Sequence, residues 1–361
     1  MTLPELLDQA GLTGRGGAAF RTHIKVAAAH DAGADLIVNA CDGERGAAKD
    51  GWVVAHHLDE LVTGARLVAP SRNQRILFAA HRDSATARRL HGAGVEVLEV
   101  PERYVSSEET SLIARAHGLL ARPLRKHDRY VTGGTTSAGD RISPTVVLNA
   151  ETVWRIAQIE EYGPDWFRGI GLPDEPGPRL VTLSGAVSRP LVIETASGVP
   201  LADLLAAAGA AADSQVLVGG LAGAFLDRRE AEECRWAGAD LARYGAMLGP
   251  GVIEVLDPRQ CPVRFVAQLL SYAGGESAGQ CGPCMFGVPA VAADWAAATA
   301  SADPAALARL RDRTPLLRSR GACRFPDGIA NFTASALRVF GDHLAQHVRG
   351  CPAERTSRVS L

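Results

Sequence analysis

Lysine is scarce in this chain: only three of its 38 Lys and Arg residues are lysines. The charges are nearly balanced, with a formal net charge of −2 and a pI near 6.6, which excludes the strongly basic surface of a nucleic-acid-binding protein. No apolar run reaches the length of a membrane span, and the opening MTLPELLDQ lacks the basic and apolar regions of a secretion signal. We expect a cytoplasmic protein with no nucleic-acid partner and no direct membrane insertion.

The cysteines are few and scattered. Their number, seven, is odd, so the sequence does not predict a disulfide framework. Cys281 and Cys284 form a C-x-x-C pair, which in a cytosolic chain indicates metal or redox chemistry. The expected buried or incidental thiols are Cys41, Cys234, Cys261 and Cys351.

Residues 11–25, GLTGRGGAAFRTHIK, form the most informative segment. A short helix over Leu3–Ala10 is expected to lead into a turn with glycines at 11, 14, 16 and 17, and a second helix from about Ala18. Such glycines let backbone N–H groups approach an anion, and the positive end of the second helix faces the same point. Lys25 would then lie about two turns into that helix, where the chain uses a compact ammonium although it otherwise favours arginine. An ordinary glycine-rich turn is the alternative.

Strand-like and helix-like segments alternate over the first part of the chain, which indicates a Rossmann-like α/β domain with a largely parallel sheet at residues 1–170. The expected strands are Asp35–Asn39, Arg75–Ala79, Val95–Val100 and Thr145–Leu148, and the expected helices are Trp52–Leu67, Ser84–His91, Glu108–Leu120 and Glu151–Glu160.

Two further domains are predicted beyond the Gly/Pro-rich break at Gly169–Pro178. Residues 176–250 read as a small sheet crossed by one helix, which resembles a β-grasp. Residues 258–350 have helical periodicity and predict a closing helical bundle that carries the C-x-x-C pair. The helical segments expected there are Val263–Tyr272, Pro304–Arg311 and Asn331–His347, and Ala292–Ala306 reads as an Ala-rich helix or loop.

Polar residues follow the strands expected in the first domain. Asn39 ends a strand, and its amide can both donate and accept hydrogen bonds at the edge where open α/β sheets bind ligands. Asp42 and Glu44 add carboxylates and Lys49 follows, although a turn with solvated charges would look the same. Asn149 ends the fourth strand and would face the same crevice. The acids of Ser107–Thr110 open another helix, where they are ordinary partners of the helix dipole.

Three thiols in the last domain suggest a metal centre. Cys281 and Cys284 have a spacing that suits an iron–sulfur cluster or zinc, and Cys323 precedes the next long helix. A structural zinc would need a fourth ligand; His343 and His347 are available, but they lie well down a helix and are expected to face solvent. A chain without metal is the third interpretation.

These segments, in this order, resemble the flavin-bearing, NADH-oxidising subunit of respiratory complex I and its counterparts in NAD-linked hydrogenases and formate dehydrogenases. The glycine-rich segment resembles the family's G-R-G-G-A-G-F-P-T-G-x-K loop, and NACDGERGAAKD its N-A-D-E-x-E-P-G-x-x-K-D. SSEETSL, VVLNAETV and LVTLSGAVSRPLVIE are similar to a helix start, a strand end and the β-grasp of that family. ESAGQCGPC and the later GAC resemble its cluster cysteines, and the resemblance runs nearly the whole length of the chain.

The resemblance implies a role for each candidate residue. Hydride would pass from NADH to FMN, and FMN would release the electrons one at a time to an iron–sulfur cluster. The cluster would pass them to a partner protein, either a ferredoxin-like protein or another redox subunit. The residues implied for FMN phosphate and ring are Gly14, Arg15, Gly16, Gly17, Lys25, Asn39, Asp42 and Asn149. Those implied around the nicotinamide are Phe20, Glu44, Glu108 and Glu109, with Glu44 and Glu109 as the catalytic candidates. The implied cluster ligands are Cys281, Cys284 and Cys323.

The chain also departs from the family pattern. Ala278 replaces the first cluster cysteine, which leaves three thiolates for a 3Fe–4S cluster or a 4Fe–4S cluster with one exposed iron. Ser107 replaces a glycine, Cys41 an aspartate and Leu148 one asparagine of a pair. These departures keep two other hypotheses open: a flavoprotein that takes electrons from ferredoxin instead of NADH, and a degenerate subunit that serves only as a scaffold.

Overall fold

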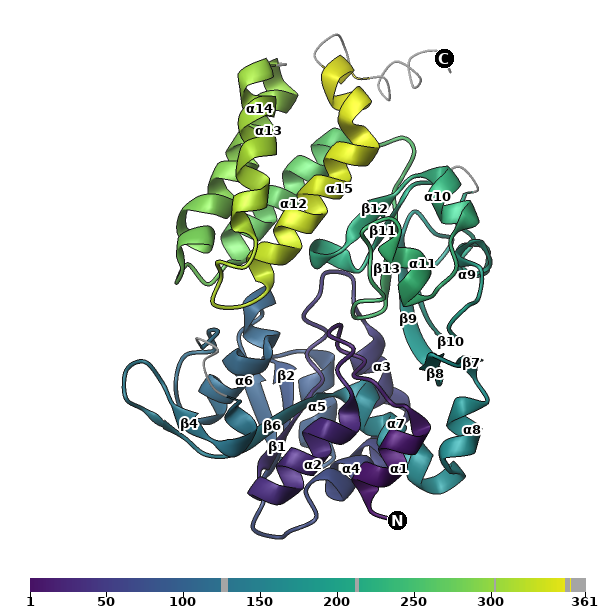
Figure 1. Ribbon diagram of the computed structural model, residues 1–361, viewed down its shortest axis with the longest axis vertical. Coiled ribbons are helices and arrows are strands. Elements are labelled where there is room, and N and C mark those ends of the chain that lie inside the picture. The colour runs from purple at the N-terminus through teal and green to yellow at the C-terminus, as the bar shows by residue number, and fades with distance from the viewer. Residues whose placement is uncertain (125–128, 212–213, 302, 348–350, 352–361) are drawn as a thin grey trace. The chain divides into compact units, whose positions relative to one another are not determined.

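The computed structural model describes residues 1–124, 129–211, 214–301, 303–347 and 351 (Figure 1). The chain divides into two compact units, each described here by itself. The first consists of Met1–Thr182, Val192–Val199 and Gly249–Gly251, and the second of Leu183–Leu191, Pro200–Leu248 and Val252–Leu361. The three-part division at 1–170, 176–250 and 258–350 stays a prediction, and residues 348–350 lie outside the described part of the chain.

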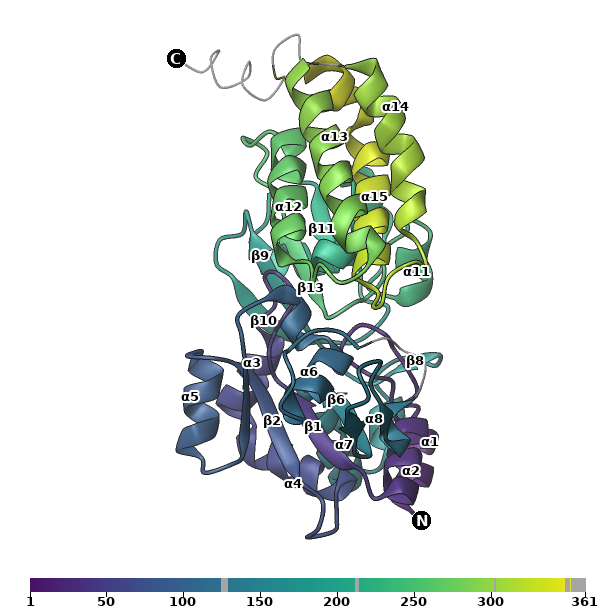
Figure 2. The ribbon, with the colours of Figure 1, turned by 90° about the vertical axis from the view of Figure 1, so that its left-hand side faces the viewer.

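A parallel four-stranded sheet forms the centre of the first unit, as predicted (Figure 2). Its strand order is β3 (Val97–Val100), β2 (Ile76–His81), β1 (Asp35–Asn39) and β6 (Thr145–Asn149). Successive residues of one strand enter different cores. Ile37 packs in a cluster with Leu112 and Ile113 of α6, whereas Leu36 and Val38 join the larger cluster of α4 and α7. A parallel sheet covered on both faces by helices explains the continuous apolar runs in these strands.

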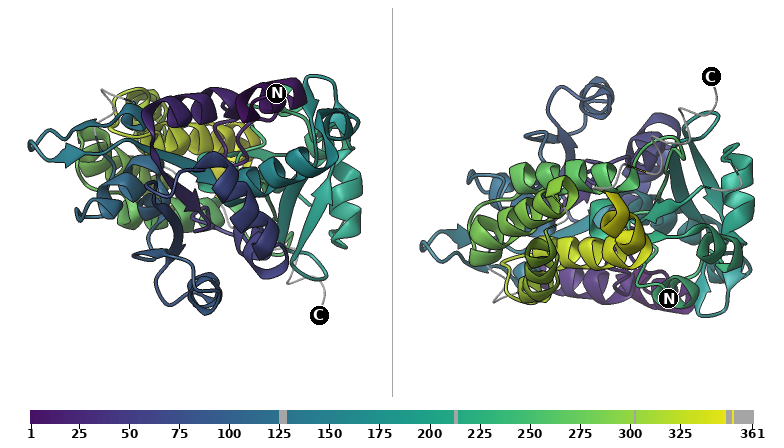
Figure 3. Two further views of the ribbon diagram at one scale, coloured as in Figure 1. Left: turned by 90° about the horizontal axis from the view of Figure 1, so that it is seen from below. Right: turned by 90° about the horizontal axis from the view of Figure 1, so that it is seen from above.

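Helices and short pairs of strands complete this unit. Thr2 and Glu5 cap α1 reciprocally, and α1 lies beside α2 (Figure 3). The α-helices are α1 (Leu3–Ala10), α2 (Thr22–Ala32), α3 (Lys49–His56), α4 (Leu58–Val68), α5 (Ala85–Gly92), α6 (Glu109–Ala116), α7 (Ala150–Tyr162) and α8 (Pro164–Arg168). The 3-10 turns are η1 (Tyr104–Ser107) and η2 (Tyr130–Thr132), and the short strand pairs are β4 (Gly134–Thr135) with β5 (Arg141–Ile142) and β7 (Gly171–Leu172) with β8 (Glu175–Pro176).

Two expectations about these helices were wrong. The second helix begins at Thr22 rather than near Ala18, because Gly17 and Ala19 have φ values of +114° and +48° that no right-handed helix accommodates. Lys25 therefore lies in the first turn of α2. The single helix expected over Trp52–Leu67 is two helices, which are separated at His57 by a non-helical backbone (φ −134°, ψ 33°).

The second sheet has five strands in the order β10 (Leu191–Thr195), β9 (Arg179–Gly185), β13 (Val252–Val255), β11 (Val216–Val218) and β12 (Ala224–Leu226). Residues of β9 and β10 are divided between the two units. Strand β11 pairs antiparallel with both β12 and β13. The associated helices are α9 (Leu201–Ala207), η3 (Gly220–Ala222), α10 (Arg228–Glu233) and α11 (Gly238–Ala242).

Four longer helices form a bundle within the second unit (Figure 2). They are α12 (Pro262–Glu276), α13 (Val288–Ser301), α14 (Pro304–Arg313) and α15 (Phe325–Gln346), with shorter turns at Pro283–Gly287 and Thr314–Leu317. The structure places a helix where residues 292–301 read as helix or loop. Within the described part of the chain, no helix is both long enough and apolar enough to cross a membrane.

Candidate functional site

Asn39 and Asn149 occupy neighbouring positions at the carboxyl ends of β1 and β6. The two strands are parallel, and their register pairs Asn39 with Asn149 directly. From β1 the chain continues to β2 and β3 on one side, whereas β6 lies on the other side, so the strand order reverses between β1 and β6. Open α/β sheets bind ligands at such a reversal, outside the carboxyl ends of the strands.

The glycine-rich loop is held against this edge. The N–H of Gly14 donates to the carbonyl of Phe20 at 2.8 Å, which closes the loop, and the N–H of Arg15 donates to Thr152 Oγ1 of α7 at 2.8 Å. A Cβ atom on Gly16 would lie 3.3 Å from the Cβ of Asn149. The loop backbone therefore runs directly over the end of β6, where a side chain at position 16 would crowd it.

Arg15 does not present its side chain to a ligand. Its guanidinium is buried and donates to the carbonyls of Pro176 and Pro178 at 3.1 and 3.2 Å. Burial, and then the charge of Arg179, hold its pKa well below the usual arginine value. Since its backbone N–H and its Nη2 already have protein partners, Arg15 anchors the loop to the rest of the unit.

Lys25 reaches the same edge from the first turn of α2. Its Nζ lies 3.1 Å from Glu109 Oε1 and donates to the carbonyl of Val147 in β6 at 3.3 Å. The side chains of Lys25 and Glu109 are 29% and 41% exposed, so both remain accessible. Phe20 is also 44% exposed. Two predicted site residues thus form one ion pair at the rim of the edge.

The segment after β1 is joined to the turn before α6. Asn39 Nδ2 donates to the carbonyl of Ser107 at 2.9 Å, and the Tyr104 hydroxyl donates to Glu44 Oε2 at 2.5 Å. Tyr104 was not predicted as a site residue, because no glycine or charge marks it in the sequence. Its hydrogen bond to Glu44 places η1 beside the predicted site residues that follow β1.

Asp42 and Glu108, both predicted to bind FMN or face the nicotinamide, use their carboxylates as helix caps. Asp42 accepts the N–H groups of Asp50 and Gly51 in the first turn of α3 at 2.9 and 2.7 Å. Glu108 accepts those of Thr110 and Ser111 in α6 at 2.8 and 3.1 Å. Burial, and then the charge of Asp50, raise the pKa of Asp42 to about 7. These two acids position the helices beside the site.

Lys49 is the centre of a buried charge network beneath the edge. The side chain is 1% exposed, and its Nζ lies 2.7 Å from Asp50 Oδ1, 3.2 Å from Glu151 Oε2 and 2.8 Å from Asn149 Oδ1. Burial alone would lower the pKa of Lys49, but Asp50 and Glu151 outweigh it and the net shift is upward. Lys49 therefore stays charged and fixes the side chain of Asn149.

The residues at this edge fit a phosphorylated flavin. The loop offers a backbone without Cβ atoms at Gly14, Gly16 and Gly17, and Lys25 supplies an accessible ammonium. The amides of Asn39 and Asn149 stand at the strand ends, each oriented by hydrogen bonds to the protein. An anion and a polar ring edge could bind together here.

The three predicted cluster cysteines are neighbours in the second unit. Cys284, in the turn Pro283–Gly287, is buried, and its thiol neighbours that of Cys281. Burial, and then the neighbouring thiols of Cys281 and Cys323, raise the pKa of Cys284 to about 12. Ala278 stands where a fourth thiolate would be expected, and its backbone N–H faces the sulfur of Cys284. This set suits a cluster held by three thiolates.

Sequence comparison divides the chain among three known families. Residues 7–158 match the Nuo51 FMN-binding domain, residues 180–217 the SLBB domain, and residues 264–347 the NADH-ubiquinone oxidoreductase-F iron-sulfur binding region. The first match covers the parallel sheet and its polar edge, and the last covers the three cysteines. The predicted FMN and iron–sulfur cofactors are thereby confirmed as those of the matched families.

Whole-chain relatives agree with these matches. The chain is 28% identical to the F 2 subunit of NADH-quinone oxidoreductase in Rhizobium meliloti (strain 1021), across 96% of this chain and 89% of the relative. It is 28% identical to the F subunit of NADH-quinone oxidoreductase in Mycobacterium bovis, across 96% and 85%. The fold matches a chain of an NAD+-reducing NiFe hydrogenase in its H2-reduced state with a TM-score of 0.86 and 27% identity. That match covers 99% of this chain and 66% of the hydrogenase chain, just under two thirds of it.

The agreement in motif order, sheet topology, family matches and whole-chain relatives leads to one conclusion. Together they support a 51 kDa-type subunit, a divergent relative of the flavin-bearing, NADH-oxidising subunits that the chain resembles over nearly its whole length.

Proposed function

We propose that this protein is an FMN-dependent oxidoreductase of the NADH dehydrogenase type. It takes electrons from NADH through FMN, passes them to an iron–sulfur centre and delivers them to a partner protein. The observation that carries this proposal is the convergence of the glycine-rich loop, Lys25, Asn39 and Asn149 at one strand-order reversal. Relatives named as subunits of NADH-quinone oxidoreductase and NAD+-reducing hydrogenase support it.

The chain's own residues would hold FMN as follows. The loop closed by Gly14 offers the backbone of Gly16 and Gly17 to the phosphate, and Lys25 adds the positive charge. Asn39 and Asn149 hydrogen-bond the polar edge of the ring, with Lys49 fixing Asn149 in place. Bound FMN supplies a two-electron acceptor that can release electrons one at a time.

The nicotinamide would lie at the exposed rim of the same edge. Phe20 offers an exposed aromatic face there, and Glu109 holds the ammonium of Lys25. Glu44 is fixed by the Tyr104 hydroxyl. We propose that Glu44 and Glu109 orient NADH, whereas Arg15, Asp42 and Glu108 support the loop and helices around it.

Cys281, Cys284 and Cys323 would hold the cluster, and the corner facing Ala278 would be left without a thiolate. Met285 and Phe286 follow Cys284 directly and are 52% and 69% exposed. Exposed apolar side chains beside a redox site suit a protein partner. We propose a ferredoxin-like or other redox subunit as that partner and a cytoplasmic location, where thiolates remain reduced.

Anaerobic titration of the purified protein tests the proposal. NADH should bleach the visible flavin absorbance, and an oxidised electron-acceptor protein, such as a ferredoxin, should restore it. NADPH is the matched control and should reduce the flavin much more slowly, because the guanidinium of Arg15 is buried on backbone carbonyls and cannot bind a 2′-phosphate.

The alternatives give other results. Bleaching by reduced ferredoxin but not by NADH would identify a flavoprotein with another donor. A protein that stays colourless after incubation with FMN would be a scaffold, and the proposal would be wrong.

A further inference from the structure

Two thiols and two histidines meet in the helical bundle, away from the three cluster cysteines. Cys261 is the residue before α12, whereas His343 and His347 lie at the end of α15 and Cys351 follows them. The sulfurs of Cys261 and Cys351 and a ring nitrogen of His347 all lie within 4.8 Å of one another. His343 Nε2 lies 3.6 Å from Cys261 Sγ and 3.5 Å from Cys351 Sγ. Cys261 and Cys351 were expected to be buried or incidental thiols, and Cys351 is buried. The expectation that the two histidines face solvent was wrong, because His347 is buried and His343 contacts both sulfurs.

The distances from His343 to the two sulfurs match those in a tetrahedral zinc site, whereas the His343 and His347 ring centroids lie 6.1 Å apart, so the two rings would draw together around an ion. Zinc binds thiolate sulfur at about 2.3 Å and imidazole nitrogen at about 2.0–2.1 Å, so a tetrahedron places sulfur and nitrogen ligands about 3.5–3.6 Å apart. Both distances from His343 Nε2 to the sulfurs have this value. Two residues on one helix at a spacing of four, as His343 and His347 are, lie on the same face.

His347 is oriented as a metal ligand would be. Its ring is buried, and Nδ1 lies 2.9 Å from the carbonyl of Thr299, which can only accept a hydrogen. The proton is therefore on Nδ1, and Nε2 carries a free lone pair. Among the described residues, Nε2 is buried without any hydrogen-bond partner. A metal-bound histidine commonly donates its other N–H to a carbonyl in this way.

We propose that Cys261, His343, His347 and Cys351 bind one zinc ion. Binding converts two thiols to thiolates and releases two protons, so the site as a whole is neutral and involves no oxidation or reduction. Two thiolates and two neutral imidazoles are a closed ligand set, which leaves no position for water or substrate. The zinc would tie the end of α15 to the beginning of α12.

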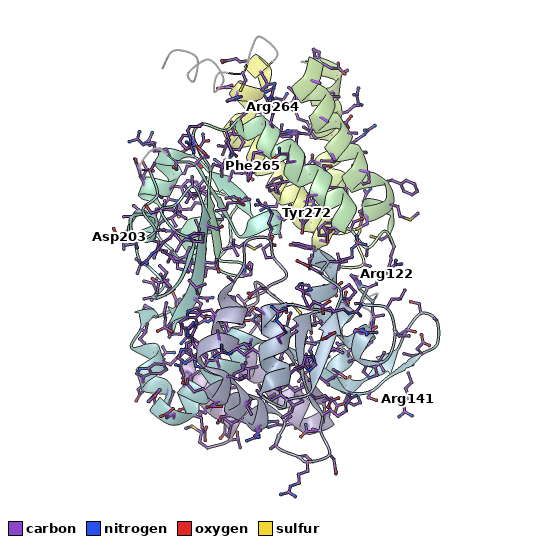
Figure 4. All side chains as sticks on the ribbon, turned by 180° about the vertical axis from the view of Figure 1, so that it is seen from behind. Arg122, Arg141, Asp203, Arg264, Phe265 and Tyr272 are labelled. Atoms are coloured by element: carbon purple, nitrogen blue, oxygen red, sulfur yellow. The ribbon has the colours of Figure 1, made fainter. Side chains whose placement is uncertain are left out.

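This site is distinct from the cluster site. Cys261 precedes the first turn of α12, where Figure 4 labels Arg264 and Phe265, and Tyr272 lies two turns further along. The cluster cysteines follow the other end of the helix. A helix of 15 residues is about 22 Å long, so one ion cannot use both sets of thiols. The inference does not depend on FMN or NADH.

Metal analysis of the full chain tests the proposal. Protein purified without chelators should contain about one zinc per chain, and Cys261→Ser/Cys351→Ser should contain less than about a tenth of that amount. Cys234→Ser is the matched control, because Cys234 is a buried thiol of the same unit outside both clusters. Cys281→Ser/Cys284→Ser should lose iron but keep zinc, which separates this site from adventitious zinc at the cluster.

Zinc-edge X-ray absorption of the unaltered protein does not depend on the folding of any variant. We expect two sulfur ligands at about 2.3 Å and two nitrogen ligands at about 2.0–2.1 Å. A wild-type protein without zinc, or with a disulfide between Cys261 and Cys351, would overturn the proposal. So would an all-sulfur coordination shell, or zinc retained in Cys261→Ser/Cys351→Ser.

Discussion

Lys25 brings an accessible side-chain cation to the polar ends of the strands. Its Nζ contacts the carbonyl of Val147 and the carboxylate of Glu109. We expect Lys25→Ala to fold but to lose most of its FMN, because the phosphate loses its charge partner. Flavin absorbance per chain after gel filtration is the measurement. His23→Ala is the control, since His23 lies two residues away on α2 and pairs with Asp8 instead. Full flavin content in Lys25→Ala would show that the loop has been misread.

Gly43 and Ser107 illustrate a second dependence between single residues. A Cβ atom on Gly43 would lie 1.7 Å from Ser107 Oγ. Ser107, which stands where the family pattern has glycine, therefore leaves room only for glycine at position 43. Gly43→Ala should lower the free energy of unfolding by about 1–3 kcal/mol through overpacking. Ser107→Gly in the same chain should restore most of that loss, as measured by urea denaturation. A double variant no more stable than Gly43→Ala would contradict the steric explanation.

Sequence reasoning predicted which residues meet more reliably than what their side chains do. Asn39 and Asn149 could be placed together, because parallel strands end at one edge of a sheet. The orientation of Arg15, Asp42 and Glu108 could not be predicted. Each lies beside the predicted site, but its side chain hydrogen-bonds to the backbone elsewhere. Arg15 donates to a carbonyl far along the sequence, and Asp42 and Glu108 each accept N–H groups at the start of a helix. A sequence motif therefore predicts which residues lie near a site. Which way a side chain points depends on the hydrogen-bond partners that compete for it.

The N-terminus of α3 depends on Asp42, and this should make stability depend on pH. An ordinary aspartate titrates near 3.8, but burial and Asp50 raise the pKa of Asp42 to about 7. Between these values the unfolded chain binds fewer protons than the folded one, so stability falls as pH rises and levels off above about pH 7. Asp42→Asn should show a smaller decrease between pH 5 and 7 in urea denaturation. An equal slope in both proteins would assign the effect to other groups.

The loop that follows α12 carries the departure with the clearest chemical consequence. In the cluster proposed for Cys281, Cys284 and Cys323, Ala278 leaves one corner without a thiolate, so a four-iron cluster should lose iron in air. Ala278→Cys should raise the iron content from about three to about four per chain and make the cluster more resistant to oxygen. Iron and sulfide assays with EPR of anaerobic protein measure this. Ser277→Cys is the control and should change neither value; less than one iron in the wild type would mean a vestigial site.

Element boundaries were predicted where periodicity and caps agree and missed where the backbone overrides them. The strands of the parallel sheet were all identified, because apolar runs between turn residues are unambiguous. The start of α2 was misplaced, since the positive φ of Ala19 is not visible in its side chain. The break at His57 was missed because helix-forming residues continue across it.

Lys49 connects elements across the whole first unit, from α3 to β6 and α7. Lys49→Met would leave Asp50 buried without its ion-pair partner and Glu151 with Arg155 alone, and should lower the free energy of unfolding by about 3–5 kcal/mol. Lys25→Met is the matched control, because Lys25 is 29% exposed and its loss should cost much less. Chemical denaturation of both variants tests this, and similar losses in the two would contradict the network.

At the scale of the molecule, the alternation of strands and helices and the order of the motifs were enough to predict the parallel sheet and the helical bundle. The proposed zinc ligands were not predicted as a set, because Cys261 is separated from His343 by 82 residues. Only the packing of α12 beside α15 brings them together. Sequence spacing can suggest a metal site when its ligands come from one segment, as the proposed cluster ligands Cys281 and Cys284 do.

The pairing of β1 with β6 also determines when the flavin site can form. Asn39 and Asn149 are 110 residues apart, and the partner of Arg15 on α7 is 137 residues away. A ribosome adds about 5–20 residues per second, so a growing chain waits roughly 5–20 seconds between the end of β1 and the end of β6. Until then β1 has an open edge and no flavin site exists beside it. Flavin uptake therefore cannot precede the synthesis of β6 and α7, and a chain that stops earlier leaves the ribosome colourless.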